Sequence, residues 1–269
     1  MTTHVLALAN QKGGVGKTSI TVGLADALAR QGRRVLVIDA DPQANATANL
    51  GIDQAPQFTL NDVLAVDPTT RTVAPGVIAE AIVPAGEGWT GVDVVAAELA
   101  LSNREQDQDP GREARLRTAM DGALDAYDVV LIDCPPNLGQ LTINALTAAD
   151  AALLVTEPRA PSVDGLTQMT RTVGTVRQHY NPALRLAGVV VNRHRTDRRD
   201  RVEWVDQLRE DYGTRLLEPY LPEREVIAVA TSAAAPLSAY GPRGRDVLDA
   251  LTAIADQITT TTGTAGATA

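Results

Sequence analysis

Short, uninterrupted apolar segments alternate along the chain with longer segments in which apolar residues recur every three or four positions. The short segments predict buried strands at Val5–Ala9, Val35–Ile38, Val92–Ala96, Val129–Ile132, Ala151–Val155 and Leu186–Val191. The periodic segments predict helices at Ser19–Gln31, Arg112–Ala126, 163–179, Arg201–Tyr212, Glu223–Thr231 and Gly244–Ile258. Strands that alternate with helices in this way are typical of a parallel sheet.

The pattern predicts an α/β fold in a single domain that spans residues 1–258. We expect a mostly parallel, twisted sheet with helices on both of its faces. Residues 40–92 are largely irregular, with one short helix at Leu60–Leu64 for which Thr59 is a candidate N-cap. The segment Thr259–Ala269 contains only Thr, Gly and Ala, and it predicts a disordered tail.

Composition narrows the class of protein. The 269 residues are 44% apolar, and Cys134 is the only cysteine, so no internal disulfide forms. The three histidines show no metal-ligand spacing. The net charge of −9 argues against a polyanion-binding molecule as a whole, although a local basic patch stays possible. The first residues lack the features of a secretory signal, and no run of about 18 apolar residues occurs, so we expect a cytoplasmic protein without a membrane partner.

A glycine-rich loop lies between the first predicted strand and the first predicted helix. It reads Lys12-Gly13-Gly14-Val15-Gly16-Lys17-Thr18. In such a loop, consecutive backbone N–H groups point at phosphate oxygens, and the helix N-terminus adds partial positive charge. Lys17 would reach the β- and γ-phosphates, the Thr18 hydroxyl would bind Mg²⁺, and Ser19 would touch the α-phosphate. The loop therefore predicts a binding site for ATP and Mg²⁺.

Lysine usage supports this assignment. Of the 24 basic residues only Lys12 and Lys17 are lysines, and both lie in the glycine loop, where a compact ammonium has a specific use. Two other interpretations compete: a plain strand-to-helix turn, and a dinucleotide-binding loop with Asp39 about 20 residues further on. The Lys17-Thr18 pair favours a triphosphate over both.

The loop departs from the ordinary GxxxxGK[ST] pattern, because Gln11 stands where the first glycine would fall. With Lys12 in front, it resembles the deviant Walker A motif of the ParA/MinD group of P-loop ATPases. That resemblance implies that Lys12 crosses a dimer interface to the nucleotide of the partner subunit. It also implies a catalytic role for Lys12 and Lys17 together.

Two predicted strands end in acidic residues. Asp39 and Asp41 follow one strand in the sequence DADPQ, and Asp133 follows another in DCPP. Carboxylates at the carboxyl ends of parallel strands face the crevice in which ligands bind. By resemblance to the same group, Asp41 orients the attacking water and Asp133 holds Mg²⁺ through a water molecule. The alternative is that these residues cap turns, which for Asp39 we consider as plausible as a role in the site.

Further residues follow from the resemblance alone. Asn192 would contact the adenine, and Pro222 would lie along the other side of the base. The chain lacks the basic C-terminal amphipathic helix of MinD-like proteins, the paired cysteines of nitrogenase iron proteins and the Tyr-rich tail of the related kinases. What remains is similar to a ParA-type partition ATPase.

An arginine cluster is the candidate DNA-binding surface. It comprises Arg193, Arg195, Arg198, Arg199 and Arg201, with Arg224 nearby. A solvated loop and helix start is the competing interpretation. Glu223 follows Pro222, where members of this group often carry a basic residue.

The resemblance implies a switch for plasmid or chromosome segregation, or for cargo positioning. ATP would hold a homodimer on nonspecific DNA, close to the nucleoid, and a ParB-like partner would stimulate slow hydrolysis. A nucleotide-gated adaptor without DNA binding and a metabolic P-loop enzyme remain alternatives.

Overall fold

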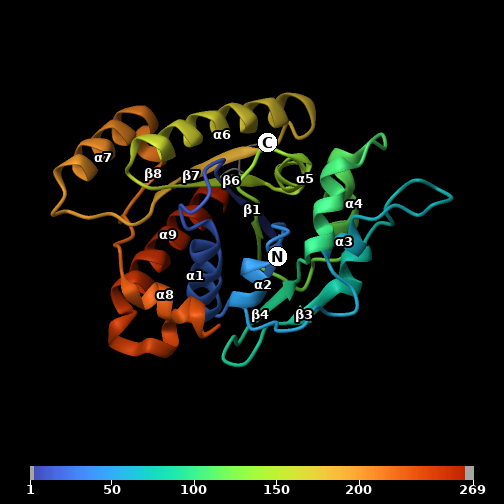
Figure 1. Ribbon diagram of the computed structural model, residues 1–269, viewed down its shortest axis with the longest axis horizontal. Coiled ribbons are helices and arrows are strands. Elements are labelled where there is room, and N and C mark those ends of the chain that lie inside the picture. Colours follow the sequence, from blue (N-terminus) through green and yellow to red (C-terminus); the bar gives the residue numbers. More distant parts are fainter. Residues whose placement is uncertain (1–2, 264–269) are drawn as a thin grey trace.

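A single eight-stranded sheet forms the centre of the protein, for which the computed structural model describes residues 3–263 (Figure 1). The strands run in the order β3-β4-β2-β5-β1-β6-β7-β8. Their bounds are β1 (His4–Ala9), β2 (Val35–Asp39), β3 (Ile82–Pro84), β4 (Val92–Val95), β5 (Val129–Asp133), β6 (Ala151–Thr156), β7 (Arg185–Val191) and β8 (Leu216–Leu217). All neighbouring strands are parallel except β3, which is antiparallel to β4. The predicted α/β fold with a mostly parallel sheet is confirmed.

Helices cover both faces of this sheet. The α-helices are α1 (Lys17–Arg30), α2 (Asn45–Asn49), α3 (Leu60–Val63), α4 (Arg115–Met120), α5 (Gln140–Ala148), α6 (Ala160–His179), α7 (Arg199–Tyr212), α8 (Glu225–Ser232) and α9 (Arg245–Gly263). Within residues 3–263, short 3₁₀ helices lie among them: η1 (Val77–Ala81), η2 (Leu99–Gln106), η3 (Arg112–Ala114), η4 (Gly213–Arg215) and η5 (Leu237–Arg243). None of the described helices has both the length and the apolar composition that crossing a bilayer requires.

Two separate apolar cores explain why the central strands read as continuous hydrophobic segments. On one face, α1, α2, α8 and α9 pack on the sheet through residues such as Leu24, Leu251 and Ile254. On the other face, α3 to α7 pack through residues such as Leu141, Leu166 and Leu208. A strand covered on both faces buries every side chain, so the alternation of a half-exposed strand is lost. Figure 1 shows α1, α8 and α9 gathered on the side opposite α6 and α7.

The structure corrects several element predictions. The helix expected at Arg112–Ala126 is a 3₁₀ turn followed by α4, which ends at Met120 because the chain turns at Gly122 with a φ of +72°. The irregular stretch 40–92 contains α2, η1 and the edge strand β3 as well as the expected short helix. That short helix has the predicted cap, since Thr59 and Asp62 form a capping box.

The chain end differs from the prediction as well. Residues 259–263 continue α9, and the Thr259 hydroxyl donates to the Ala255 carbonyl at 3.0 Å as in any helical turn. The rest of the predicted disordered tail, residues 264–269, lies outside the described part of the chain. The sequence pattern does not predict the two-residue strand β8, because two apolar residues are too few to form a pattern.

Candidate functional site

The glycine loop connects β1 to the N-terminus of α1, at the carboxyl edge of the sheet. Gly14 and Gly16 have φ angles of +78° and +87°, in the left-handed region that favours glycine. At Gly16 a Cβ would also lie 2.2 Å from the Asn192 side-chain nitrogen, so the loop backbone and the end of β7 are in direct contact. Around Gly14 nothing lies within 4 Å of such a Cβ, which leaves the loop open on that side.

Asp133 is joined to α1 by two hydroxyl groups. The Thr18 hydroxyl donates to one carboxylate oxygen at 2.7 Å, and the Thr21 hydroxyl donates to the other at 2.9 Å. Burial raises the pKa of Asp133 above its usual range, while these two hydrogen bonds and Lys17 oppose the shift. Sequence reasoning missed Thr21, although its position three residues after Thr18 places both on one face of a helix.

Lys17 and Asp41 lie beside Asp133. The Lys17 side chain is only 6% exposed, and burial lowers the pKa of its ammonium, against the influence of Asp133, Cys134 and Asp41. The Asp41 carboxylate accepts a hydrogen bond from the Gln43 backbone at 3.0 Å, which orients it at the end of β2. The predicted Lys17, Asp41 and Asp133 are therefore brought together at one point.

These residues fit a nucleoside triphosphate with magnesium. Among the described residues, no three His, Cys, Asp or Glu side chains converge as a metal cage. A magnesium ion here would take the Thr18 hydroxyl and phosphate oxygens as ligands, with Asp133 behind it, which is the oxygen chemistry that this ion prefers.

Asp39 has a structural role in this arrangement. It is fully buried at the end of β2, level with Asp133 on β5. Its carboxylate accepts hydrogen bonds from the Thr47 backbone at 2.8 Å, the Thr47 hydroxyl at 2.7 Å and the Asp41 backbone at 3.1 Å. Burial is the main cause that raises the pKa of Asp39, followed by the Asp133 charge. Asp39 thus holds α2 and the Asp41 backbone on the strand end.

Lys12 is exposed at the start of the loop. Its backbone N–H donates to the Asn10 side chain at 2.8 Å, and Asn10 in turn donates to the Val155 carbonyl at 2.6 Å. Gly165 of α6 packs so closely that a Cβ there would lie 2.9 Å from the Asn10 side-chain oxygen and 3.2 Å from the Lys12 Cβ. The backbone of Lys12 is therefore fixed on β6 and α6 while its side chain is left exposed to solvent.

Asn192 and Arg193 contact the loop from the end of β7. The Asn192 amide donates to the Val15 carbonyl at 2.8 Å, and Arg193 donates to the Gly14 carbonyl at 2.8 Å. Arg193 also pairs with the buried Glu157 at 2.5 Å. Sequence reasoning placed Arg193 among the DNA contacts, whereas the structure places its guanidinium on the phosphate loop.

A cavity of about 600 Å³ adjoins the loop. Ser19, Asn192, Arg193 and Glu223 line it, together with residues of α8. Ser19 and Asn192 are thus on one cavity, as a nucleotide base site would require. Pro222 lines the neighbouring cavity of about 850 Å³ with His194 and Tyr220, so its assignment to the base stays a prediction.

The remaining predicted DNA contacts are mostly paired with acidic side chains. Arg195 pairs with Asp197 at 2.8 Å, Arg199 with Glu203 at 3.1 Å and Arg224 with Asp246 at 2.6 Å. Each pair lowers the positive charge that the surface presents. Arg195, Arg198 and Arg201 do line one concave region, to which Arg199 does not contribute.

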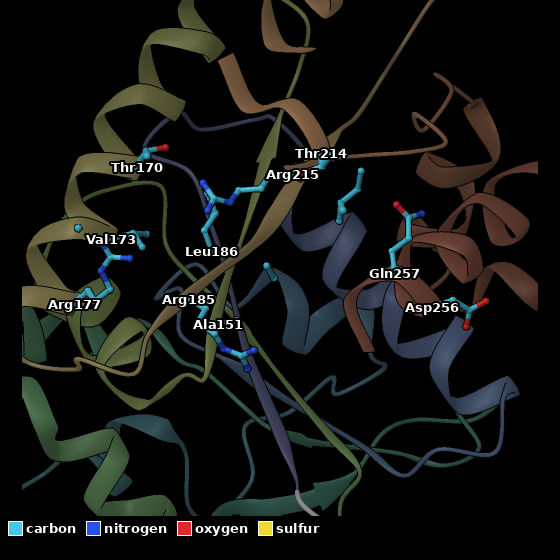
Figure 2. A pocket seen from close by; sticks show the side chains of 13 residues that line it. Ala151, Thr170, Val173, Arg177, Arg185, Leu186, Thr214, Arg215, Asp256 and Gln257 are labelled. Carbon is cyan, nitrogen blue, oxygen red and sulfur yellow. The ribbon is translucent and has the colours of Figure 1, made fainter. Parts of the chain in front are cut away.

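A larger cavity lies elsewhere. Its volume is about 910 Å³, and its lining residues, shown in Figure 2, come from α6, the starts of β6 and β7, η4, β8 and α9. The starts of β6 and β7 lie at the amino edge of the sheet, opposite the carboxyl edge that carries the glycine loop. Thr170 and Arg177 project into it from α6, and Arg215 from η4. None of the predicted site residues lines it, so size alone does not identify the functional site.

A glycine loop at the start of α1, with acidic ends of β2 and β5 facing it, is the arrangement of P-loop nucleoside triphosphatases. Comparison with known proteins agrees: the family model described as an AAA domain matches residues 3–186. The chain is 33% identical over 244 residues to the sporulation initiation inhibitor protein Soj of Bacillus subtilis, covering 90% of this chain and 92% of Soj. It is 39% identical over 247 residues to the chromosome partitioning protein ParA of Caulobacter vibrioides, covering 88% and 87%. The chain therefore belongs to the ParA-type family of partition ATPases.

Solved structures extend the comparison. A Mycobacterium smegmatis protein described as cobyrinic acid a,c-diamide synthase, with a bound ATP analogue and magnesium, is 32% identical with a TM-score of 0.74, over 87% of this chain and 93% of that one. A Cyanothece McdA variant in complex with ATP has a TM-score of 0.80 at 23% identity, over 97% and 96%, which shows the shared fold.

Proposed function

We propose that this chain binds and slowly hydrolyses ATP with Mg²⁺, and that ATP converts it into a homodimer that acts as a segregation or positioning switch. The observation that carries the proposal is the buried Lys17 at the glycine loop, with Asp41 and Asp133 beside it. A buried ammonium beside two carboxylates, at the end of a glycine loop, suits a triphosphate.

Each residue has a distinct task in this scheme. The backbone of Gly13, Gly14, Val15 and Gly16 binds the phosphates, and Lys17 neutralises charge that develops during phosphoryl transfer. Asp41 orients the attacking water. Thr18 and Asp133 would hold a magnesium ion, which would neutralise phosphate charge.

Lys12 is the residue that makes dimerisation part of the scheme. Its side chain is exposed, and its backbone is fixed by Asn10 and the close approach of Gly165. Because the Lys12 backbone is fixed and its side chain extends into solvent, the ammonium suits a contact in trans with the nucleotide of a second subunit. The family membership of the chain supports the same assignment.

Nonspecific DNA binding and a ParB-like activator complete the switch. The DNA contacts would come from the exposed arginines of the 195–201 segment, chiefly Arg198 and Arg199, and from Arg224. Each phosphate contact would steepen the salt dependence of binding by roughly one unit. The ATP dimer would hold DNA, and partner-stimulated hydrolysis would release it near the nucleoid.

The test compares two variants with the natural chain. Asp41→Ala should trap an ATP dimer, because the water is no longer oriented, whereas Lys12→Ala should stay monomeric with ATP still bound. Mass measured by light scattering after size exclusion, with ATP and with ADP, distinguishes the species. Monomeric Asp41→Ala at saturating ATP would contradict the scheme. Salt-sensitive retention on DNA, measured with and without ATP, tests the DNA contacts separately.

A metabolic P-loop enzyme is the second candidate, because the M. smegmatis relative is described as an amide-forming synthase. Such an enzyme turns over rapidly without a partner protein. ATP hydrolysis by the isolated chain on the order of 10 per second, the median for enzymes, would favour this candidate over the switch.

A further inference from the structure

A cavity of about 390 Å³ beside the candidate nucleotide site is lined mainly by arginines. Its lining residues, which define what we call the Arg201 cavity, are Arg159, Arg195, Arg198, Asp200, Arg201 and Glu223. They come from three segments that are distant in sequence: the connection before α6, the β7–α7 connection with the first turn of α7, and the connection before α8. Four positive charges face two negative ones, so the cavity has a positive excess although the whole chain carries −9.

Arg201 is the most deeply placed of the four arginines. It is only 7% exposed, and its guanidinium donates no hydrogen bond to any described residue. The Nη1 nitrogen is fully buried without a partner. The closest carboxylate oxygen, on Asp200, is 3.8 Å from Nε and too far for a hydrogen bond. Buried charged donors are almost always satisfied by an acceptor. The described residues do not provide one for the Arg201 guanidinium, so an acceptor from outside the protein would complete it.

Two helices begin at this cavity, and both begin with an arginine. Arg159 is the N-cap of the 20-residue α6, and Arg198 is the N-cap of the 14-residue α7. Neither N-cap accepts a hydrogen bond through its side chain, and arginine has no acceptor to offer. N-caps are ordinarily Ser, Thr, Asp or Asn, because their side-chain oxygens accept hydrogen bonds from the unpaired N–H groups of the first turn, where the helix carries partial positive charge. Two cationic caps at one cavity add to that charge.

The acidic residues nearby form ion pairs with the two outer arginines of the cavity, Arg159 and Arg195. Arg195 pairs with Asp197 and, at 3.7 Å, with Glu223. Arg159 pairs with Glu157 at 3.3 Å. Within the described residues, no carboxylate reaches the Arg201 guanidinium at hydrogen-bond distance, and Arg198 has no ion pair there.

We propose that the Arg201 cavity binds a compact tetrahedral oxyanion, a free phosphate or the terminal phosphate of a small phosphomonoester, with Arg201 as its deepest ligand. The planar guanidinium fork matches phosphate oxygens, and the two helix N-termini supply further positive potential. A compact anion suits the buried position of Arg201, whereas a duplex backbone contacts side chains at the surface. The cavity shares no lining residue with the glycine loop, and it meets the cavity of about 600 Å³ beside that loop only at Glu223, so the anion site is adjacent to the proposed ATP site.

The experiment uses the full chain saturated with Mg²⁺ and a non-hydrolysable ATP analogue, so that phosphate cannot occupy the glycine loop. Inorganic phosphate is titrated by calorimetry at constant ionic strength, with chloride as the reference anion. Arg201→Gln should weaken phosphate binding by about 10-fold or more, the effect of losing hydrogen bonds to a charged group. Arg30→Gln is the matched control, because Arg30 is exposed in the last turn of α1 and does not line the cavity, and it should change binding less than about 2-fold.

Two additions keep the outcome decisive. Arg198→Gln removes an exposed arginine of the same cavity and tests the site if Arg201→Gln fails to fold. If the analogue does not bind, the ATP proposal fails, and titration of Lys17→Ala still reports on the Arg201 cavity. The proposal is overturned if phosphate binds no better than chloride. It is also overturned if Arg201→Gln and Arg198→Gln both bind phosphate as tightly as the natural chain. Arg201-dependent retention on a short DNA duplex without binding of free phosphate overturns it as well, because that result would assign the cavity to DNA.

Discussion

The two hydroxyl groups that bind Asp133 allow a quantitative test of the site. Thr21 is fully buried in α1, and its hydroxyl donates to an Asp133 oxygen at 2.9 Å. Thr21→Val removes the hydroxyl and keeps the branched shape, so packing against the sheet changes little. The same hydroxyl also lies 3.1 Å from the Lys17 carbonyl four residues earlier in α1. What Thr21→Val loses beyond that ordinary helical contact is a hydrogen bond to a buried carboxylate, which is worth about 1.5–3 kcal/mol.

We therefore expect the free energy of unfolding of Thr21→Val to fall by about 1.5–3 kcal/mol in the absence of nucleotide. Urea titration of the natural chain and the variant at the same neutral pH measures this difference. Thr167→Val is the control for the helical contact alone, because the hydroxyl of this solvent-exposed residue donates to the carbonyl four residues before it in α6. That change should cost less than about 1 kcal/mol.

The result that would refute the reasoning is a Thr21→Val variant as stable as the Thr167→Val control. It would mean that Thr18 alone satisfies Asp133, and that the second hydroxyl adds nothing to the strand end. A decrease well above about 3 kcal/mol would instead indicate that β5 and α1 separate when the hydroxyl is removed.

Three further predictions follow from the site. Gly16→Ala should lower ATP affinity at least about 10-fold in a filter-binding assay, because φ is +87° and a Cβ meets Asn192, whereas Gly174→Ala, in open space on α6, should leave it unchanged. Arg193→Ala, which loses the bonds to Gly14 and Glu157, should weaken ATP binding in the same assay more than it weakens DNA retention. Burial raises the pKa of the Cys134 thiol, so iodoacetamide at mildly alkaline pH should label it, by mass spectrometry, only at the rate of unfolding. Rapid labelling of the native chain would show that this strand end opens.

Much of the site could be predicted because its parts are local in sequence. Gly13 to Thr18 form one continuous segment whose backbone binds phosphate, so the sequence shows the whole loop. Asp41 and Asp133 follow apolar strands that the sequence pattern also reveals. Parallel strands place their carboxyl ends at one edge, so the acidic residues and the loop had to meet. The register that sets Asp39 level with Asp133 confirms this geometry.

The errors fall where long-range contacts override local pattern. The helix predicted over Arg112–Ala126 ends at Met120. Arg115 within it is buried and forms ion pairs with Asp107 and Asp109. The loop that carries those two aspartates has no periodic signal. Edge strands β3 and β8 are too short to show one either.

The amino-acid sequence by itself determined the class of protein, since a glycine loop and two acidic strand ends are short, local and chemically specific. Tertiary structure alone decided which groups complete the site. Thr21 bonds to Asp133 across 112 residues, and Arg193 bonds to Gly14 across 179. The Arg201 cavity likewise needs the N-terminal ends of α6 and α7 and the segment before α8 brought together. Such contacts depend on how strands and helices pack, and no local pattern of polar and apolar residues encodes them.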